Sequence, residues 1–175
     1  MPTLFILCGP AGSGKSTWLA NVFMQNWDKS MSVIISRDEI RFSELTAAGL
    51  DKKDYFKKEN IVYAKYTAVI AKELAAGNDV YADSTCLTKK SREKLIRTVE
   101  RQTRTPFNVI ALDFYREDMK IRCYNQNRQR SGLALVPDAV VEQQCDNYER
   151  PTTAEYKICQ VFSIDIDERM VMNNE

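Results

Sequence analysis

The chain contains the stretch Gly9-Pro10-Ala11-Gly12-Ser13-Gly14-Lys15-Ser16-Thr17, and the segments on either side of it indicate the fold. The stretch fits G-x-x-x-x-G-K-[ST], the pattern of a phosphate-binding loop. Before it runs Thr3 to Cys8, a short apolar segment typical of a buried parallel strand. After it, Thr17 to Trp27 is rich enough in helix-forming residues to continue as a helix. Strand, glycine-rich loop and helix in this order predict a site for a nucleoside triphosphate.

Each residue type in the loop has a defined task at a triphosphate. Glycine lets the backbone turn its N–H groups toward a phosphate, and the helix N-terminus adds partial positive charge. We expect Lys15 to reach the β- and γ-phosphates as a catalytic group, and the Ser16 hydroxyl to ligate Mg²⁺. An accidental glycine-rich turn is the alternative, expected in roughly one chain in a hundred of this length. The expected cofactors are therefore ATP and Mg²⁺, with these cofactor-binding residues: Gly12, Ser13, Gly14, Lys15, Ser16 and Thr17.

Length and composition predict one ordinary globular domain. The chain has 175 residues, which suits a single core spanning residues 1–175. Apolar residues make up 44% and charged residues 28%, and no apolar run approaches the roughly 18 residues of a membrane span. The net charge of +1 gives no global argument for nucleic acid, so any such site must be a local patch. We expect no membrane partner.

The cysteine and histidine counts restrict the chemistry. The five cysteines are odd in number and form no C-x-x-C pair, which indicates reduced thiols in a cytoplasmic setting. The chain has no histidine, which excludes every mechanism that uses histidine as base or metal ligand. A general base, where one is needed, is therefore expected to be a carboxylate.

Strand-like and helix-like segments alternate along the whole chain. The expected strands are Thr3–Cys8, Ser32–Ser36, Asp79–Asp83, Phe107–Phe114 and Val161–Asp165. The expected helices begin at Thr17, Arg37, about Asp54, Thr88, about Glu117 and Val136. This alternation predicts an α/β fold of three layers, with a five-stranded parallel sheet and helices on both faces. Ligands in such sheets bind outside the carboxyl ends of the strands, so the residues just after each strand are the site candidates.

Asp38 follows the second expected strand by two residues and has two interpretations. It could accept a proton from a substrate hydroxyl that attacks the γ-phosphate. Alternatively, Ser36-Arg37-Asp38-Glu39 fits an S-x-x-E capping box, and an aspartate in the first turn of a helix is favoured by the helix dipole. Both hold together if Ser36 and Glu39 cap the helix while Asp38 points toward the substrate.

Arg41 and Asp83 are further candidates at the strand ends. Arg41 lies three residues after Asp38 on the same side of its helix, and is suited to gripping a substrate phosphate or to standing in solvent. Asp83 closes the third expected strand and could hold Mg²⁺ through water or orient the substrate. The alternative for Asp83-Ser84-Thr85 is a helix-capping turn.

A basic segment at about residues 117–136 predicts a lid. Arg122, Arg128 and Arg130 cluster before Ser131-Gly132, where a flexible piece could fold over ATP and bring positive charge to the transferring phosphoryl group. A solvated basic helix end is the alternative. Arg128 and Arg130 lie nearest the turn and are the expected catalytic arginines, although spacing does not choose between them.

With these residues assembled, the chain resembles the P-loop 5′-hydroxyl polynucleotide kinase family of the phage type, which is related to zeta-toxin-like and small-molecule P-loop kinases. Beyond the loop, the resemblance is carried by Ser36-Arg37-Asp38-Glu39-Ile40-Arg41, Asp83-Ser84-Thr85, Asn127-Arg128-Gln129-Arg130-Ser131-Gly132, Val136-Pro137 and Tyr148-Glu149-Arg150-Pro151. The resemblance implies Asp38 as general base, Arg41 on the 3′-phosphate side of the substrate, Asp83 and Thr85 as substrate contacts, and lid arginines on ATP.

The chemistry of the acceptor separates the possible functions. A nucleotide monophosphate is already anionic and needs no base, whereas a hydroxyl acceptor benefits from a carboxylate such as Asp38. The leading prediction is transfer of the γ-phosphate of ATP to the 5′-hydroxyl of DNA or RNA. A small-molecule kinase acting on a nucleoside, nucleotide or sugar derivative is the alternative, which the near-neutral net charge favours. A nucleotide-switched binding module without an acceptor is the third hypothesis.

Overall fold

The computed structural model describes residues 1–24, 31–51 and 54–165. It contains a five-stranded sheet in the order β2-β3-β1-β4-β5, in which all neighbours pair in parallel. The strands are β1 (Thr3–Cys8), β2 (Ser32–Ser36), β3 (Asp79–Asp83), β4 (Asn108–Asp113) and β5 (Ile158–Ser163). The predicted sheet is therefore confirmed, and β1 to β3 begin and end where the sequence placed them.

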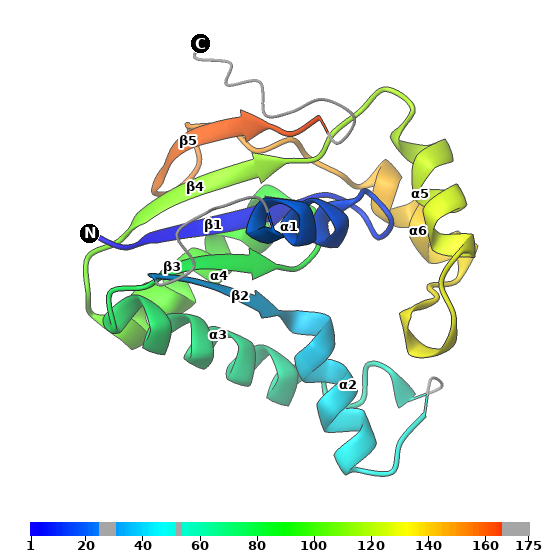
Figure 1. Cartoon of the computed structure of the whole chain (residues 1–175), viewed down its shortest axis with the longest axis horizontal. Coiled ribbons are helices and arrows are strands. Elements are labelled where there is room, and N and C mark those ends of the chain that lie inside the picture. Colours follow the sequence, from blue (N-terminus) through cyan, green and yellow to red (C-terminus); the bar gives the residue numbers. More distant parts are fainter. Residues whose placement is uncertain (25–30, 52–53, 166–175) are drawn as a thin grey trace.

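Helices connect the strands and cover the sheet, which confirms the predicted three-layer α/β fold (Figure 1). They are α1 (Lys15–Met24), α2 (Arg37–Ala47), α3 (Glu59–Ala75), α4 (Lys89–Thr103), α5 (Met119–Arg128) and α6 (Asp138–Asp146), with a short 3₁₀ helix at Gly132–Ala134. The part of the first expected helix beyond Met24 lies outside the described residues. Among the described residues, no helix combines the length and apolarity that crossing a bilayer requires.

The core divides into two layers because side chains alternate along the strands. Leu4, Ile6 and Cys8 of β1 face a cluster that includes side chains of α3 and α4. Leu7 and the partly buried Phe5 face the opposite way and pack in a cluster with Trp18 and Leu19 of α1. The central strand is thus buried on both faces, as expected for a parallel sheet with helices on either side.

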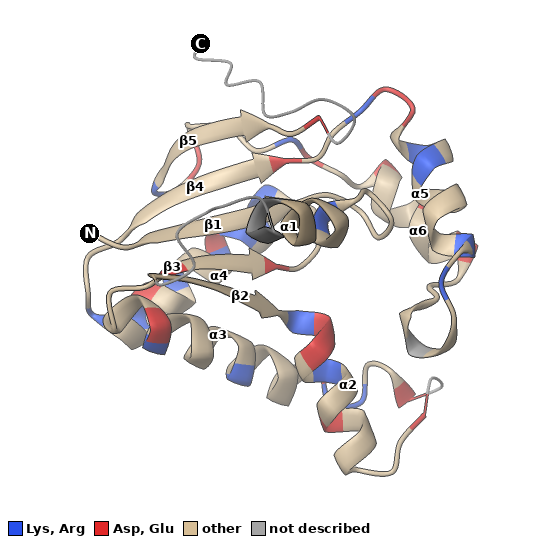
Figure 2. Ribbon diagram, in the orientation of Figure 1, with Lys and Arg blue, Asp and Glu red and all other residues tan. Residues whose placement is uncertain are grey.

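The strand order places the glycine-rich loop at the topological switch point. From β1 the chain moves to β2 on one side, and after β3 it crosses β1 to reach β4 on the other. Ligands of open parallel sheets bind where the order reverses, outside the carboxyl ends. Figure 2 shows the strands largely free of charged residues, with acidic residues at the carboxyl ends of β3 and β4.

The two largest differences from the predicted element boundaries lie at the starts of α3 and β5, and the other described boundaries differ by at most two residues. The helix expected from about Asp54 begins at Glu59, because Asp54 instead forms a turn in which Lys57 N donates to its carbonyl at 2.8 Å. The strand expected at Val161–Asp165 begins at Ile158. It is an edge strand whose Cys159 and Gln160 side chains are exposed, so its backbone pairing leaves little apolar signal in the sequence.

Candidate active site

The glycine-rich loop joins β1 to α1 and is held from three directions. Gly9 N donates to the carbonyl of Thr85 at 2.9 Å, and Ala11 N donates to Oε1 of Gln144 in α6 at 2.8 Å. Gly12 has φ +86°, and a Cβ there would lie 2.6 Å from the carbonyl oxygen of Cys123 in α5. Glycine is therefore required at position 12 both by the backbone conformation and by the close approach of α5.

Lys15 is folded back into the loop. Its Nζ donates to the carbonyl of Gly9 at 2.8 Å, to that of Pro10 at 2.7 Å and to Ser13 Oγ at 3.2 Å. Burial lowers the pKa of Lys15, and the nearby Asp83 carboxylate opposes that shift. The ammonium group is thus held among neutral oxygens, which phosphate oxygens could replace as stronger acceptors.

Ser16 and Asp83 meet at the edge of the sheet. Ser16 Oγ donates to Asp83 Oδ2 at 3.1 Å, although 67 positions separate them in the chain. Burial raises the pKa of Asp83, while Lys15 and the hydrogen bond from Ser16 oppose that effect. A hydroxyl and a carboxylate side by side are the hard oxygen donors that Mg²⁺ prefers. Within the described residues, no group of three or more His, Cys, Asp or Glu side chains could hold a metal, so such an ion would need further ligands from phosphate or water. Thr17 follows in α1 with an exposed side chain.

Asp38 lies in the first turn of α2, where the structure shows the Ser36 half of the predicted capping box. Ser36 caps the helix, because Glu39 N donates to Ser36 Oγ at 3.4 Å. The Asp38 side chain takes no part in the cap and is 59% exposed. Sheet register brings it close to Asp83, since Ser36 is the cross-strand partner of Asp83. The carboxylate of Asp38 is therefore accessible at the carboxyl edge of the sheet.

Arg41 is held beside Asp38 by a second carboxylate, that of Glu59. Arg41 NH1 forms an ion pair with Asp38 Oδ1 and donates to the Tyr55 hydroxyl at 3.0 Å. Its Nε and NH2 donate to Glu59 Oε2 at 3.1 and 3.0 Å, and Arg37 NH2 pairs with Glu59 Oε1. The Arg41 side chain is only 7% exposed, so a solvent-facing arginine is excluded. One glutamate at the start of α3 thus joins two arginines of α2.

Glu59 and Tyr55 also belong to this group, although neither was predicted from the sequence. Tyr55 donates to Asp38 Oδ1 at 3.2 Å, and its ring lies 4.6 Å below the Arg41 guanidinium. Both residues come from the segment before α3, which reads only as a polar stretch and a helix start. No local pattern separates Glu59 from any acidic residue in a first helical turn.

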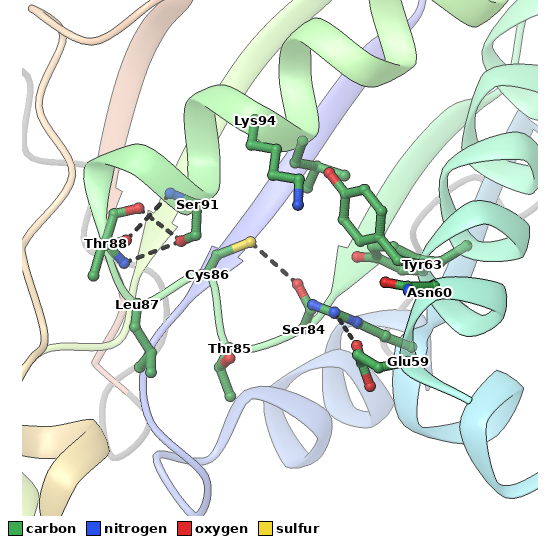
Figure 3. Close-up of a pocket in the computed structure, with 13 residues that line it drawn as sticks. Glu59, Asn60, Tyr63, Ser84, Thr85, Cys86, Leu87, Thr88, Ser91 and Lys94 are labelled. Carbon is green, nitrogen blue, oxygen red and sulfur yellow. Dashed lines mark hydrogen bonds and ion pairs between the residues drawn. The ribbon is translucent and has the colours of Figure 1, made fainter. Parts of the chain in front are cut away.

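A pocket of about 380 Å³ adjoins these residues (Figure 3). It lies between α3, α4 and the loop after β3, and its lining includes Arg37, Glu59, Ser84 and Thr85. Thr85, a predicted substrate contact, therefore lines a pocket next to the arginine pair. The Ser84 hydroxyl lies 3.1 Å from Cys86 Sγ, and the following helix is capped by Thr88 rather than by Asp83.

The two arginines of the predicted lid, Arg128 and Arg130, differ in what they face. Arg128 NH2 pairs with Asp138 Oδ2 at 3.2 Å on an exposed surface. Arg130 instead adds to the lowering of the Lys15 pKa, which is due mainly to burial, and opposes the rise that burial causes in the pKa of Asp83. The loop between α5 and α6 is closed at its base by Asn127, which donates to the carbonyl of Val136 at 2.6 Å and accepts from its N–H at 3.0 Å.

Comparison with known proteins agrees with this arrangement. A family model described as an AAA domain matches residues 4–151. No curated protein is significantly similar to the chain in sequence.

Solved structures with the same fold include kinases of different kinds. A fungal RNA kinase is 17% identical with a TM-score of 0.59, over 95% of this chain and 77% of that one. A gluconokinase from Sinorhizobium meliloti 1021 is 16% identical with a TM-score of 0.52, over 96% and 85%. Kti12 from Chaetomium thermophilum, solved with ADP-AlF3, is 17% identical with a TM-score of 0.61, over 95% and 90%. At these identities the likeness shows the fold alone.

Proposed function

The chain belongs to the AAA domain family and has a P-loop kinase fold, and from its site we propose that it transfers the γ-phosphate of ATP to the 5′-hydroxyl of a DNA or RNA strand. The observation that carries this proposal is the Asp38 carboxylate, which is 59% exposed although Arg41 and Tyr55 hold it in place. A fixed, accessible carboxylate near the phosphate loop suits an alcohol acceptor, which must lose a proton during transfer.

The donor side of the reaction uses the loop. Residues Gly12 to Thr17 bind the ATP phosphates through backbone N–H groups and the start of α1. Lys15 exchanges its contacts with the Gly9 and Pro10 carbonyls for phosphate oxygens. Ser16 and Asp83 fit Mg²⁺, which would neutralise charge on the phosphates.

The acceptor side uses Asp38, Arg41, Asp83 and Thr85. The bond between the γ-phosphorus and its bridging oxygen breaks, the bond from the 5′-oxygen to that phosphorus forms, and the 5′-hydroxyl proton passes to Asp38, with ADP as the leaving product. Arg41 contacts the phosphate on the 3′ side of the first nucleotide through NH1, the nitrogen that faces Asp38. Asp83 and Thr85 contact the same nucleotide.

The lid completes the site. We assign residues 117–136 as the lid of a single kinase domain spanning residues 1–175. Of the two predicted arginines, we propose Arg130 as the one that acts on the transferring phosphoryl group, because its charge influences the pKa of both Lys15 and Asp83. Arg128 supports the lid through Asp138.

A small-molecule kinase is the second candidate. The pocket of about 380 Å³ has several hydroxyl side chains in its lining, including those of Ser84 and Thr85, which would suit one small polar molecule. The net charge of +1 also favours a small molecule, because binding a long polyanion depends on positive charge.

Transfer of label from γ-labelled ATP separates the candidates. Wild type is incubated in parallel with 5′-hydroxyl oligonucleotides and with a pool of nucleosides, nucleotides and sugar derivatives, with Lys15→Ala as the inactive control. Label at the 5′ end of an oligonucleotide supports the proposal. Label on a small molecule while every oligonucleotide stays unlabelled supports the second candidate. Label on neither, despite tight ATP binding, would indicate a nucleotide-switched module.

A further inference from the structure

The pocket beside the arginine pair contains buried polar groups that the proposed phosphate transfer does not use. Its walls are the start of α3, the start of α4 and the loop after β3 (Figure 3). Tyr63 and Tyr66 project from α3, and Lys94 projects from α4. None of these three was singled out by sequence.

Three donors at this pocket are buried without a well-formed hydrogen bond to any described residue, although Tyr63 has a contact with the Thr98 side chain and Tyr66 with that of Ser84. They are the hydroxyls of Tyr63 and Tyr66 and the Nε of Arg37. Tyr66 is only 1% exposed, and the nearby Ser84 hydroxyl is engaged with Cys86 Sγ at 3.1 Å. Burial raises the pKa of both tyrosines, so each hydroxyl keeps its proton for donation. Because unsatisfied buried polar groups are costly, donors gathered at one pocket indicate a ligand rich in acceptor oxygens.

The charges around the pocket favour an anion. Arg37 and Lys94 lie over the Tyr63 ring at 5.3 and 4.8 Å, and among the described residues that line the pocket Glu59 is the one carboxylate. Glu59 is already engaged by Arg37 and Arg41. The N-terminal turn of α4 carries no acidic residue, and its Thr88 and Ser91 also line the pocket. The positive end of the helix dipole thus adds to the two cations.

The pocket is directly connected to the acceptor side of the site. Glu59 accepts from Arg41, which faces Asp38, and from Arg37, which faces the pocket. The two guanidinium groups share one carboxylate, so the anion sites that they serve are neighbours. Successive phosphates of a nucleic acid strand are neighbours in the same way.

We propose that this pocket binds the second phosphate of a single-stranded acceptor, counted from its 5′-hydroxyl, through Arg37, Tyr63, Tyr66 and Lys94. The inference rests on the proposed polynucleotide kinase function and specifies its substrate as a strand that continues beyond the first nucleotide. A volume of about 380 Å³ accommodates a phosphate with part of the adjoining nucleoside.

Two short acceptors isolate the second phosphate. One is a dinucleotide with a 5′-hydroxyl and a 3′-hydroxyl, and the other is the same dinucleotide with a 3′-terminal phosphate. We expect kcat/KM to be about tenfold higher for the second, the effect of charge-assisted hydrogen bonds to one phosphate. The 5′-deoxy analogues of both, which cannot react, give the same comparison as dissociation constants by calorimetry.

Variants assign the effect to the pocket. Tyr66→Phe removes a buried hydroxyl whose one contact is with the Ser84 side chain, so the unfolding free energy should fall little while the tenfold preference decreases. Lys94→Met should also decrease the preference. Lys90→Met is the matched control, because it removes the same charge from an exposed position of α4 outside the pocket lining and should keep the preference.

The outcomes separate this inference from the proposed function. A preference that is present in wild type, reduced in Tyr66→Phe and Lys94→Met, and kept in Lys90→Met supports the second-phosphate site. Equal kcat/KM and equal binding for the two acceptors overturn it even when both are phosphorylated. An equal loss in Lys90→Met and Lys94→Met also overturns it, since general electrostatics then explain the effect. Tighter binding of the phosphorylated analogue without transfer to either acceptor supports the site while the kinase proposal fails.

Discussion

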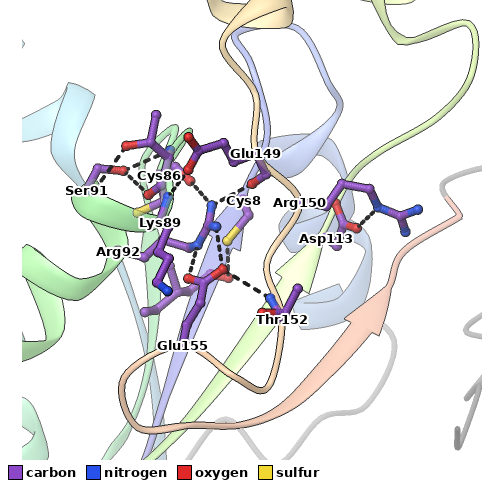
Figure 4. A network of polar contacts seen from close by, with 12 residues as sticks. Cys8, Cys86, Lys89, Ser91, Arg92, Asp113, Glu149, Arg150, Thr152 and Glu155 are labelled. Carbon is purple, nitrogen blue, oxygen red and sulfur yellow. Dashed lines mark hydrogen bonds and ion pairs between the residues drawn. The ribbon is translucent and has the colours of Figure 1, made fainter.

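Two arginine–glutamate networks in this protein have the same chemistry and opposite surroundings. In the first, Arg92 of α4 is completely buried and donates to Glu155 through Nε and NH2 at 2.7 and 2.6 Å (Figure 4). Its NH1 donates to the carbonyls of Cys86 and Glu149 at 3.0 and 2.8 Å. Every guanidinium nitrogen has a partner, and the network fastens the segment before β5 to α4.

In the second network, Glu59 joins Arg37 and Arg41 at the edge of the sheet. Here Arg37 Nε has no hydrogen bond to any described residue, and the attached Asp38 is 59% exposed. A satisfied buried network supports the fold, whereas one with unused donors and an accessible carboxylate can still bind a ligand. Both networks contain the same residue types. What distinguishes a structural network from a binding site is therefore whether its donors and acceptors are all hydrogen-bonded within the protein.

The largest expected effect comes from breaking the buried pair. Arg92→Met leaves Glu155 and two backbone carbonyls without their donor, so the unfolding free energy should fall by about 3–5 kcal/mol. Urea denaturation followed by circular dichroism measures the change. The double variant Arg92→Met/Glu155→Leu should recover part of the loss. Transfer activity per folded molecule should survive; its loss at unchanged stability would contradict the structural assignment.

Replacing Asp38, the exposed carboxylate of the second network, should lower activity and leave stability unchanged. Asp38→Asn removes the proposed base, so phosphoryl transfer should fall by about 10²-fold or more. Because Asp38 is largely exposed and takes no part in the α2 cap, the denaturation midpoint and ATP affinity should stay close to wild type. Single-turnover rates and ATP titrations measure both quantities. Full activity in Asp38→Asn would leave the residue with a structural role alone, as a partner of Arg41 and Tyr55.

Of the two arginines in the proposed lid, Arg130 is expected to affect the reaction and Arg128 mainly the structure. Arg130→Ala should lower kcat by about tenfold or more, since it removes positive charge near Lys15 and Asp83. Arg128→Ala breaks an exposed pair with Asp138, a kind of pair that contributes about 0–1 kcal/mol to stability, and should change kcat less. Steady-state kinetics of the two variants side by side decide the assignment. A larger loss in Arg128→Ala would reverse it.

The smallest expected effect is on stability at Asp83. Burial raises the pKa of this carboxyl, so the folded protein binds its proton more tightly than the unfolded chain does. Ionisation of Asp83 therefore costs stability as the pH rises above the ordinary carboxyl pKa. Asp83→Asn should be more stable than wild type at pH 7 while losing activity, and the stability difference should vanish near pH 3. Denaturation at both pH values tests the sign, and a less stable variant at pH 7 would show that Lys15 and Ser16 outweigh burial.

Much of the fold follows from short stretches of sequence. The glycine-rich loop and the bounds of β1, β2 and β3 agree with the pattern, because a strand between turn residues is defined within about ten positions. The Ser36 cap was also readable, since a cap uses residues three apart. The edge strand β5 was predicted three residues late, because its Cys159 and Gln160 side chains are exposed and add no apolar signal at the start of the strand.

What the sequence determined by itself is the phosphate loop, the parallel α/β order and the acidic residues at the strand ends, because turns, caps and periodicity are local. Only the tertiary structure decided that Glu59 joins Arg37 to Arg41, and that Arg92, within a strongly charged helix, is completely buried. It also buried the Tyr66 hydroxyl beside a pocket without a well-formed hydrogen bond. These features depend on how α2, α3 and α4 pack together. Arg41 and Glu59 are 18 positions apart and Arg92 and Glu155 are 63 apart, so no local sequence pattern identifies either pair.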